Sequence, residues 1–334
     1  MKTYFITGGC GFIGFFITKE LLKDPNNKIV LYDAHKHYVP IDKSKWLYCQ
    51  AYRTSELNGN ERVIRIRGDV NDRGLLKESL LEYKPEVIIH LAALPIADAS
   101  NYYPYEAKNN ILDTIITLMD VLRENQLKID RIIYASSSMV YGDFLKDENG
   151  RVIPAKEDQP CNPKEIYGSM KLAGEYIVKA YHKRFGIPYV IIRPSAVYGH
   201  TDCNRRVTEI FITNALEGKE LVLENGGLHQ LDFSYVKDTA HGFVLAANSP
   251  NAIGETFNIT RGEGRTIKEL AEIINFLIPE SRIVTKEAEV YRPNRGKLDI
   301  SKARRILGYE PEYSLERGIK ETVEQIKQEK RKID

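Results

Sequence analysis

Short apolar runs alternate with longer segments of helical spacing along the first half of the chain. The apolar runs predict strands at residues 3–6, 28–32, 62–67, 87–91, 131–136 and 189–192. The longer segments predict helices at about residues 12–22, 109–124 and 167–185. The run at 87–91 is almost continuously apolar, which is typical of a strand buried on both faces. Alternation of this kind indicates βαβ units on a parallel sheet.

The second half of the chain has a looser pattern. Residues 142–163 are polar and include prolines, which predicts a loop. From residue 193 onwards the segments are shorter and mixed, and residues 232–247 look like a strand and a helix that pack back on the main sheet. We therefore expect an α/β fold. Residues 1–192 form a Rossmann-type, doubly wound parallel sheet, and residues 193–334 mainly form a smaller, mixed α/β substrate-binding lobe.

The composition is that of an ordinary globular protein, with 43% hydrophobic and 28% charged residues among 334. The formal net charge is only +2, so the chain lacks the broad basic field that nucleic-acid binding requires. No apolar run approaches the ~18 residues that span a bilayer. We expect neither nucleic acid nor a membrane as a partner.

The cysteines and histidines show no metal-binding pattern. Cys10, Cys49, Cys161 and Cys203 are widely spaced and form no C-x-x-C motif. The histidines have no partners at the spacing of metal ligands. We expect no metal site. Unpaired thiols in a chain without a secretion signal favour a reducing cytoplasm.

A glycine-rich turn follows the first predicted strand and opens the first predicted helix. Gly8, Gly11 and Gly14 have G-x-x-G-x-x-G spacing. Glycine is needed where the chain turns tightly, where phosphate approaches the backbone and where helix meets strand. A helix N-terminus also offers unpaired N–H groups and about half a positive charge, which hold a diphosphate without a basic side chain. The turn therefore predicts a dinucleotide site.

Acidic residues end the second and third predicted strands. Asp33 lies about 20 residues beyond the turn, where a carboxylate accepts hydrogen bonds from the adenosine ribose and repels a 2′-phosphate. Asp33 thus favours NAD over NADP, although Lys36 or His35 can partly offset the repulsion. Asp69 ends a strand on the same edge of the sheet. It either reaches the adenine or caps the helix that follows.

Tyr167 and Lys171 follow a Ser136-Ser137-Ser138 run by about 30 residues. Their i, i+4 spacing places both on one face of a helix. A tyrosine needs its pKa lowered by roughly three units, or about 4 kcal/mol, to act as a base near pH 7. A lysine ammonium and an oxidised nicotinamide ring both favour the phenolate. A serine hydroxyl at a strand end can hydrogen-bond the substrate oxygen. The pattern predicts a redox enzyme that acts on an alcohol.

In this order, the motifs resemble those of one known family. The chain resembles the extended short-chain dehydrogenases/reductases, and within them the NAD-dependent epimerases and dehydratases that act on nucleotide sugars. The matching motifs span nearly the whole chain, at residues 7–14, 68–69, 90–93, 109–110, 136–142, 167–171, 193–199, 232–238 and 292–303. The resemblance implies tightly held NAD, hydride transfer at a sugar carbon, usually C4, and Tyr167 as the base.

The resemblance also implies a set of cofactor-binding residues. They come from the glycine turn, the strand ends and the two long helices: Gly8, Gly11, Phe12, Ile13, Gly14, Asp33, Asp69, Val70, Leu91, Ala92, Ala93, Asn110, Tyr167 and Lys171. It further implies a homodimer in which two helices of each subunit pair. The candidate helices are those at 109–124 and 167–185.

The residues before Tyr141-Gly142 separate the branches of this family. In sugar 4,6-dehydratases the corresponding stretch resembles T-D-E-x-Y-G, because eliminating water from C5–C6 needs an additional acid and base. This chain has Ser137-Ser138-Met139-Val140, which supplies no carboxyl group and is similar to the S-S-x-x-V-Y-G pattern of sugar 4-epimerases. We align Ser137 with the hydroxyl that assists the tyrosine and keep Ser138 as the alternative.

Two departures from the family pattern concern the substrate. In epimerases of this group, the stretch that corresponds to Leu231-Asp232-Phe233 resembles R-D-[FY]. In the motif R-x-x-N-x-Y-G of the same enzymes, Ala196 of this chain replaces the asparagine. An arginine usually aimed at the nucleotide or its diphosphate is therefore missing. We expect the substrate, a nucleotide-diphosphate sugar, to be held by Ser138 and by arginines that grip phosphate: Arg205, Arg206, Arg292 and Arg295.

The sequence favours a nucleotide-sugar 4-epimerase, which oxidises C4 and then reduces the 4-keto sugar from the other face. A C4 dehydrogenase or a 4-keto reductase of a GDP-, dTDP- or UDP-linked sugar shares part of this chemistry and stays open. A 4,6-dehydratase and a non-catalytic NAD sensor are less favoured. A sensor would need the glycine turn but neither Tyr167 nor Lys171.

Overall fold

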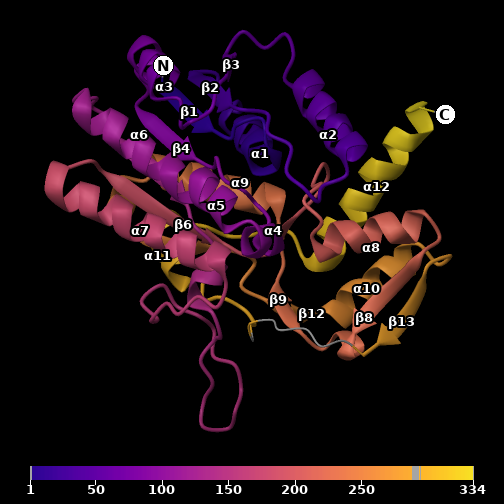
Figure 1. The fold of residues 1–334 in the computed structure, drawn as a ribbon. Helices are drawn as coiled ribbons and strands as arrows, with labels where there is room; N and C mark the ends of the chain where they lie inside the picture. The colour runs from indigo at the N-terminus through magenta and orange to yellow at the C-terminus, as the bar shows by residue number, and fades with distance from the viewer. Residues whose placement is uncertain (1, 288–292, 294, 334) are drawn as a thin grey trace.

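The computed structural model describes residues 2–287, 293 and 295–333. Its main sheet has seven parallel strands in the order β11-β6-β5-β4-β1-β2-β3 (Figure 1). These strands are β1 (Lys2–Thr7), β2 (Asn27–Asp33), β3 (Val63–Arg67), β4 (Val87–His90), β5 (Arg131–Ala135), β6 (Tyr189–Pro194) and β11 (Thr256–Ile259). The strand order reverses beside β1, which leaves a crevice at the carboxyl ends of the strands. The predicted α/β, doubly wound fold is confirmed.

Helices cover both faces of this sheet, because successive side chains of a buried strand point to opposite faces. In β1, Tyr4 and Ile6 belong to the core beneath α1 and α9, whereas Phe5 belongs to the core beneath α3, α6 and α7. These helices are α1 (Phe12–Leu21), α3 (Arg73–Tyr83), α6 (Asp113–Glu124), α7 (Ile166–Phe185) and α9 (Val236–Asn248). The central strands therefore carry apolar residues at nearly every position, whereas the edge strand β3 exposes Arg65 and Arg67.

Further elements connect the strands and helices and shape one end of the sheet. They are α2 (Lys43–Glu56) between β2 and β3, α4 (Ala97–Tyr102), α5 (Pro104–Ala107), the π-helical turn η1 (Lys108–Leu112) before α6, and the 3₁₀ turn η2 (Ser138–Tyr141) after β5. The helix predicted at 109–124 thus begins with a wider π turn, a feature frequent at functional sites. The predicted loop at 142–163 includes an arm that projects from the body (Figure 1). It carries an antiparallel bridge between Lys146 and Val152 and a parallel bridge from Ala155 to Leu298.

The second lobe has its own apolar core. Phe211, Leu221, Leu270 and Ile319 pack together in it. Its elements are β7 (Val197–Tyr198), α8 (Val207–Leu216), β8 (Glu220–Glu224), η3 (Asn225–Gly227), β9 (Gln230–Asp232), β10 (Ser234–Tyr235), β12 (Gly264–Thr266), α10 (Ile267–Leu277), β13 (Arg282–Lys286) and α12 (Leu315–Ile333). The pairs β8–β13 and β7–β10 are parallel, and β9–β12 is antiparallel.

The chain returns to the main sheet after entering the second lobe. The helix α9 packs against α1, and β11 adds an edge strand beside β6. The short elements η4 (Pro250–Ala252) and α11 (Ser301–Leu307) flank this edge. The sequence predicted that a strand and a helix at 232–247 pack back on the main sheet. In the structure the helix α9 does so, whereas β10 pairs with β7, and the strand that joins the sheet is β11, which the pattern did not indicate. No helix in the described part of the chain is long and apolar enough to span a membrane.

Candidate active site

A cavity of about 440 Å³ opens at the carboxyl ends of the strands, between the main sheet and the second lobe. Its walls come from the glycine turn, the ends of β2 to β5, the helix α7 and the segment that leads into α8. Every described residue that the sequence assigned to cofactor, catalysis or substrate lines it. Arg292, the remaining assigned residue, lies outside the described residues. Residues spread over most of the chain thus meet at one site.

The glycine turn is packed too tightly for side chains. Gly8 has a φ of 68°, and a Cβ there would lie 2.8 Å from the backbone nitrogen of Ala92. A Cβ on Gly14 would lie 2.7 Å from the carbonyl oxygen of Gly9. Gly11 precedes α1 without a side-chain cap, so no side chain at that position accepts the first N–H groups of the helix. This cradle fits the diphosphate of a dinucleotide.

Asp33 is oriented by the backbone at the end of β2. Its carboxylate accepts hydrogen bonds from the N–H groups of Cys10, at 3.0 Å, and His35, at 2.7 Å. The carboxylate is thereby fixed beside the glycine turn, where the adenosine ribose of a dinucleotide would lie. This placement agrees with the preference for NAD inferred from the sequence.

Asp69 and Lys36 form an ion pair in the same part of the cavity, with 2.6 Å between Nζ and Oδ2. Burial raises the pKa of Asp69, but hydrogen bonds from Lys36 and the Asn71 N–H outweigh it, so the net pKa is below its usual value. Lys36 also donates to Asn110, so its charge is directed to Asp69 rather than to Asp33. Asp72, not Asp69, caps α3. The cap alternative for Asp69 is therefore wrong.

Tyr167 and Lys171 lie one turn apart on α7 and face the end of β5. The ammonium of Lys171 donates to the carbonyl oxygen of Ala135 at 2.8 Å and lies 5.9 Å from the centroid of the Tyr167 ring. Lys171 is fully surrounded by protein, and this burial lowers its pKa to about 8. Ser137, at the strand end, accepts from the Met139 N–H. The Ser–Tyr–Lys arrangement expected from the sequence is thus assembled in space.

A second cation acts on Tyr167. Burial raises the pKa of this phenol above its usual value, and the charge of Arg206 and a hydrogen bond with Ser137 partly offset the increase. Arg206 comes from the segment before α8 and is held by Asp202, at 2.8 Å. The sequence assigned Arg206 to phosphate binding. Its position also makes it an electrostatic partner of the candidate base.

A buried network fixes α7 against the sheet and selects among the serines. Ser136 donates to Glu175 at 2.5 Å, and Arg193 on β6 binds the same carboxylate with two nitrogens, at 2.9 and 2.7 Å. Both charged side chains are almost completely buried. All three serines line the cavity, but the hydroxyl of Ser136 is engaged by Glu175.

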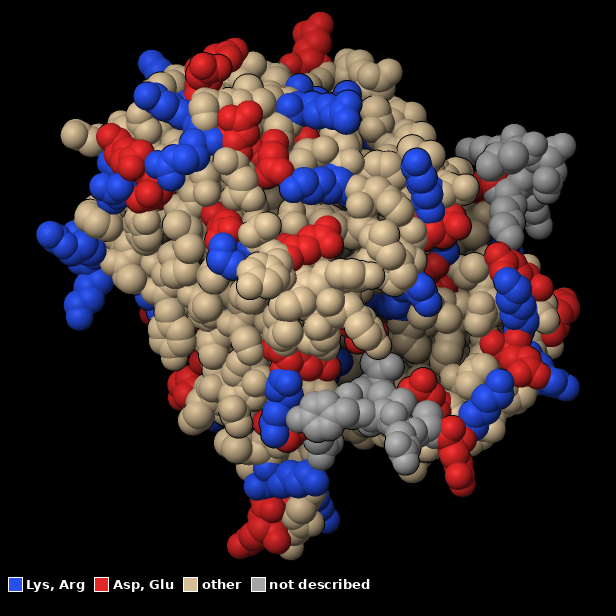
Figure 2. All heavy atoms as spheres, viewed as in Figure 1, with Lys and Arg blue, Asp and Glu red and all other residues tan. Residues whose placement is uncertain are grey.

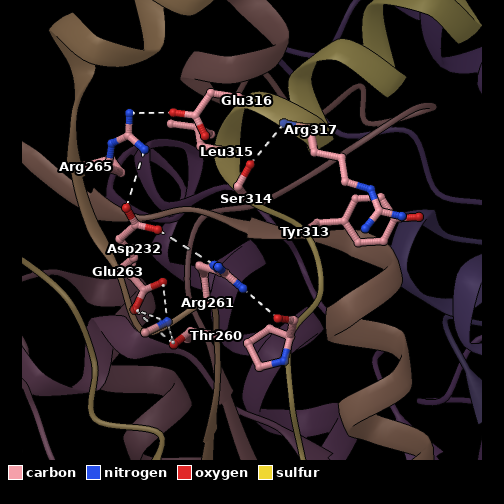
Figure 3. Close-up of polar contacts among 12 residues, drawn as sticks. Asp232, Thr260, Arg261, Glu263, Arg265, Tyr313, Ser314, Leu315, Glu316 and Arg317 are labelled. Carbon is pink, nitrogen blue, oxygen red and sulfur yellow. Dashed lines mark hydrogen bonds and ion pairs between the residues drawn. The ribbon is translucent and has the colours of Figure 1, made fainter.

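The family departure at Leu231-Asp232-Phe233 changes the cavity wall. Side chains alternate along a strand, so Leu231 and Phe233 line the cavity while Asp232 points away from it. The buried carboxylate of Asp232 accepts from the Thr260 hydroxyl at 2.9 Å and from the Leu298 N–H at 3.0 Å. Figure 3 shows Asp232 in contact with Thr260 and, in another part of the view, the ion pair of Arg265 with Glu316 at the start of α12. The cavity wall here is apolar.

The other predicted phosphate-binding arginines differ in exposure. Arg205 is exposed and donates to the carbonyl oxygen of Pro40 at 3.3 Å, so it points to the rim. Arg295 also lines the cavity. Figure 2 shows acidic and basic side chains interspersed over this face of the molecule, in line with the formal net charge of +2.

Sequence reasoning missed several residues of the cavity. Arg53 and Gln50 come from α2, a helix that the periodicity did not indicate. Arg53 is 4% exposed and has no motif around it that would mark it. Asp98 lines the cavity from the first turn of α4. None of these residues carried a signal in the sequence, because each is placed by the fold alone.

A parallel, doubly wound sheet with a side-chain-free cradle and an acid at the end of β2 defines a dinucleotide-binding protein of the Rossmann class. The tyrosine and lysine beside the cradle make it an oxidoreductase-type enzyme site. The chain belongs to the NAD dependent epimerase/dehydratase family, whose model matches residues 4–260. It is therefore an NAD-dependent enzyme of the extended short-chain dehydrogenase/reductase type.

Individual relatives extend over the whole chain. A putative UDP-glucose 4-epimerase of Methanocaldococcus jannaschii is 32% identical and covers 98% of this chain and 99% of its own length. The dTDP-glucose 4,6-dehydratase of Haemophilus influenzae is 26% identical, with 97% of each chain covered. The solved UDP-glucuronic acid 4-epimerase from Bacillus cereus, in complex with UDP-glucuronic acid and NAD, is 28% identical, with a TM-score of 0.87 over 98% of this chain and 99% of that one. Epimerases and dehydratases are thus both among the relatives.

Proposed function

We propose that this enzyme is a nucleotide-sugar 4-epimerase. The observation that carries the proposal is the meeting of Tyr167, Lys171 and Ser137 at one wall of the cavity, with Ser138 and Met139 in place of an acid pair. Epimerisation at C4 needs one base that removes a proton and later returns it. It needs no further acid or base, which matches this set of side chains.

Tyr167 takes the proton of the C4 hydroxyl in this mechanism and gives it back at the end. Ser137 donates a hydrogen bond to the same sugar oxygen and orients it toward the phenol. Lys171 and Arg206 favour the phenolate by their positive charge. NAD, when bound along the glycine turn, supplies the acceptor for the hydride of C4 and its return. The apolar wall of Leu231 and Phe233 leaves room for the sugar to rotate.

We propose a nucleotide-diphosphate sugar as the substrate. Arg206 and Arg295 line the cavity on the side of the second lobe, and guanidinium groups bind phosphate oxygens in pairs. The relatives named above are enzymes of UDP- and dTDP-linked sugars. Because Leu231 stands where related epimerases carry an arginine, the choice between UDP, GDP and dTDP is left to experiment.

One observation favours a second candidate, 4,6-dehydration. The exposed carboxylate of Asp98 lines the cavity, and one relative is a dTDP-glucose 4,6-dehydratase. Dehydration needs an acid and a base in addition to the tyrosine. Among the described residues of the cavity, the other carboxylates are Asp33 and Asp69, which are engaged by Cys10 and Lys36 at the far end. We therefore prefer epimerisation.

The test is product analysis with UDP-, GDP- and dTDP-linked hexoses. Epimerisation gives the C4 epimer by NMR without net absorbance of reduced nicotinamide. Accumulating reduced cofactor indicates a C4 dehydrogenase instead, and a 4-keto-6-deoxy product indicates a dehydratase. Asp98→Asn serves as the matched variant, because an epimerase keeps turnover within about threefold while a dehydratase that uses Asp98 loses it.

We also propose that two copies of the chain pair through α7 and its neighbours. Tyr102 on α4, Tyr105 on α5 and Tyr176 on α7 are 80%, 82% and 63% exposed, and α4 and α5 both contact α7. Exposed aromatic side chains that cluster on one face are typical of a protein interface. The cytoplasmic location expected from the sequence stays a prediction.

A further inference from the structure

Arg53 is a buried cation that joins the two lobes at the cavity. It lies in the last turn of α2 and is 4% exposed. Its Nε donates to the carbonyl oxygen of Cys10 at 3.0 Å, and its Nη1 donates to the carbonyl oxygen of Thr201 at 2.9 Å. Cys10 belongs to the glycine turn, and Thr201 belongs to the segment of the second lobe that leads to Arg206. Arg53 also lines the cavity.

The charge of Arg53 lacks an acidic partner within the described part of the chain. No carboxylate there lies within ion-pair distance of it, and its hydrogen bonds within the described residues run to the carbonyl oxygens of Cys10 and Thr201. An arginine keeps its charge in proteins. A buried charge is costly unless an opposite charge compensates it. Two carbonyl dipoles provide only part of that compensation, so a bound anion near the guanidinium would stabilise it.

The position of the guanidinium indicates which anion. Arg53 contacts the glycine turn beside the N-terminus of α1, where Gly11 provides no side-chain cap. A helix N-terminus and a guanidinium that converge on one point match a diphosphate.

We propose that Arg53 binds the diphosphate of a ligand in this cavity and thereby links it to the second lobe through Thr201. The contact with Cys10 favours the diphosphate of the dinucleotide over that of the nucleotide sugar. Arg53 then acts as more than a clamp on two carbonyl groups. It completes the anion site that the glycine turn begins, from a helix that lies outside the glycine motif.

Arg62 provides a matched control for this proposal. It donates to the carbonyl oxygens of Asp24 and Leu22, at 2.8 and 3.1 Å, so it also clamps two carbonyl groups. Arg62 does not belong to the cavity wall as the described residues define it. Replacing Arg62 therefore removes a clamp of the same kind without removing charge from the site.

The experiment compares Arg53→Met, Arg53→Lys and Arg62→Met by calorimetric titration with ADP-ribose, adenosine, UDP and uridine, and by melting temperature. Where NAD co-purifies, its occupancy after dialysis is measured as well. We expect Arg53→Met to weaken the binding of ADP-ribose at least tenfold. Its affinity for adenosine, which has no phosphate, should stay within threefold of the wild-type value. Arg53→Lys should recover part of the loss, and Arg62→Met should change melting temperature alone. These readouts do not depend on the reaction catalysed.

The outcomes separate the two sources of diphosphate from a purely structural role. If Arg53→Met binds UDP more weakly but binds ADP-ribose as wild type does, Arg53 contacts the diphosphate of the nucleotide sugar instead of that of the cofactor. Equal loss of affinity for adenosine and ADP-ribose, or unchanged affinity for both diphosphates, overturns the proposal and leaves Arg53 a clamp like Arg62. If Arg53→Met does not fold, Arg53→Lys decides, because it keeps the charge but loses the two-carbonyl fork.

Discussion

At the scale of single residues, the environment of Tyr167 decides how the site works. The spacing of Tyr167 and Lys171 is visible in the sequence, because four residues on a helix return to the same face. The influence of Arg206 is not visible, because Arg206 is 39 residues further on and reaches the phenol only through the path of the chain after β7. The sequence assigned both Arg205 and Arg206 to phosphate binding. In the structure Arg205 is exposed, whereas Arg206 lies close enough to Tyr167 to influence its pKa.

Replacement of Tyr167 by phenylalanine should abolish turnover without loss of the cofactor. The ring still packs in its buried place, but no group is left to remove the C4 hydroxyl proton, so we expect kcat to fall by about 10²–10⁴. Steady-state kinetics and bound NAD after purification check this. Turnover within tenfold of wild type in Tyr167→Phe would show that another group is the base.

Lys171 should make stability depend on pH in a defined direction. Burial lowers its pKa to about 8 in the folded protein, from about 10.4 in an unfolded chain. Between these values the unfolded state binds more protons, so the contribution of Lys171 to stability rises as pH rises from about 8 to 10 and is lost as pH falls. The full effect is on the order of 3 kcal/mol.

The measurement compares ligand-free wild type with Lys171→Met by urea unfolding at several pH values. The difference in free energy of unfolding should move in favour of wild type between pH 8 and 10, and the variant should show no such slope from this site. A parallel pH dependence in the two proteins would contradict a depressed pKa at Lys171.

At the scale of elements, α7 is positioned by a buried ion pair rather than by its own sequence. Glu175 and Arg193 expose 1% and 4% of their side chains, and the carboxylate also holds Ser136 next to the catalytic serines. Helix periodicity predicted α7 but not this pairing, which joins a helix to a strand end. The helix α2 escaped prediction altogether, because only Cys49 and Arg53 are buried in it and so little apolar signal marks its face.

Glu175→Gln should destabilise the protein by about 3–5 kcal/mol, because it leaves the charge of Arg193 buried without its partner. Chemical denaturation measures this. The double variant Glu175→Leu with Arg193→Met should recover most of that loss, since removing both charges also removes the cost of burying them.

A matched exposed ion pair serves as the comparison. Lys108 and Asp113 lie 2.7 Å apart with about half and a third of their side chains exposed, and Asp113→Asn should cost less than about 1 kcal/mol. Equal losses in Glu175→Gln and Asp113→Asn would mean that the buried pair does not anchor α7.

At the scale of the whole molecule, the site exists because two lobes close over the end of one sheet. The glycine turn and Asp33 belong to the sheet, while Arg206, Leu231 and Phe233 reach the cavity from the second lobe. The chain crosses between the lobes more than once, since β11 and α9 return to the sheet. A single boundary at residue 193 therefore describes function better than it describes the path of the backbone.

The proposed pairing of subunits leads to a prediction at this scale. Tyr105→Asp combined with Tyr176→Glu places charge in the exposed aromatic face, so we expect a dimer of wild type to become a monomer by size-exclusion chromatography with light scattering. Phe276→Asp is the control, because Phe276 is 84% exposed on α10 of the other lobe. A monomeric wild type, or a dimer that only Phe276→Asp dissociates, would rule out this face.

The first six strands of the sheet, the helices α1, α6 and α7, the glycine turn, the acid at the end of β2 and the Tyr–Lys spacing were determined by the sequence, because each depends on residues close together in the chain. Local periodicity and turn chemistry act over a few residues and leave a readable pattern. Tertiary structure alone placed Arg53 beside the glycine turn, Arg206 beside Tyr167 and β11 beside β6. These contacts join residues far apart in the chain, and no local pattern records which distant side chain will compensate a buried charge.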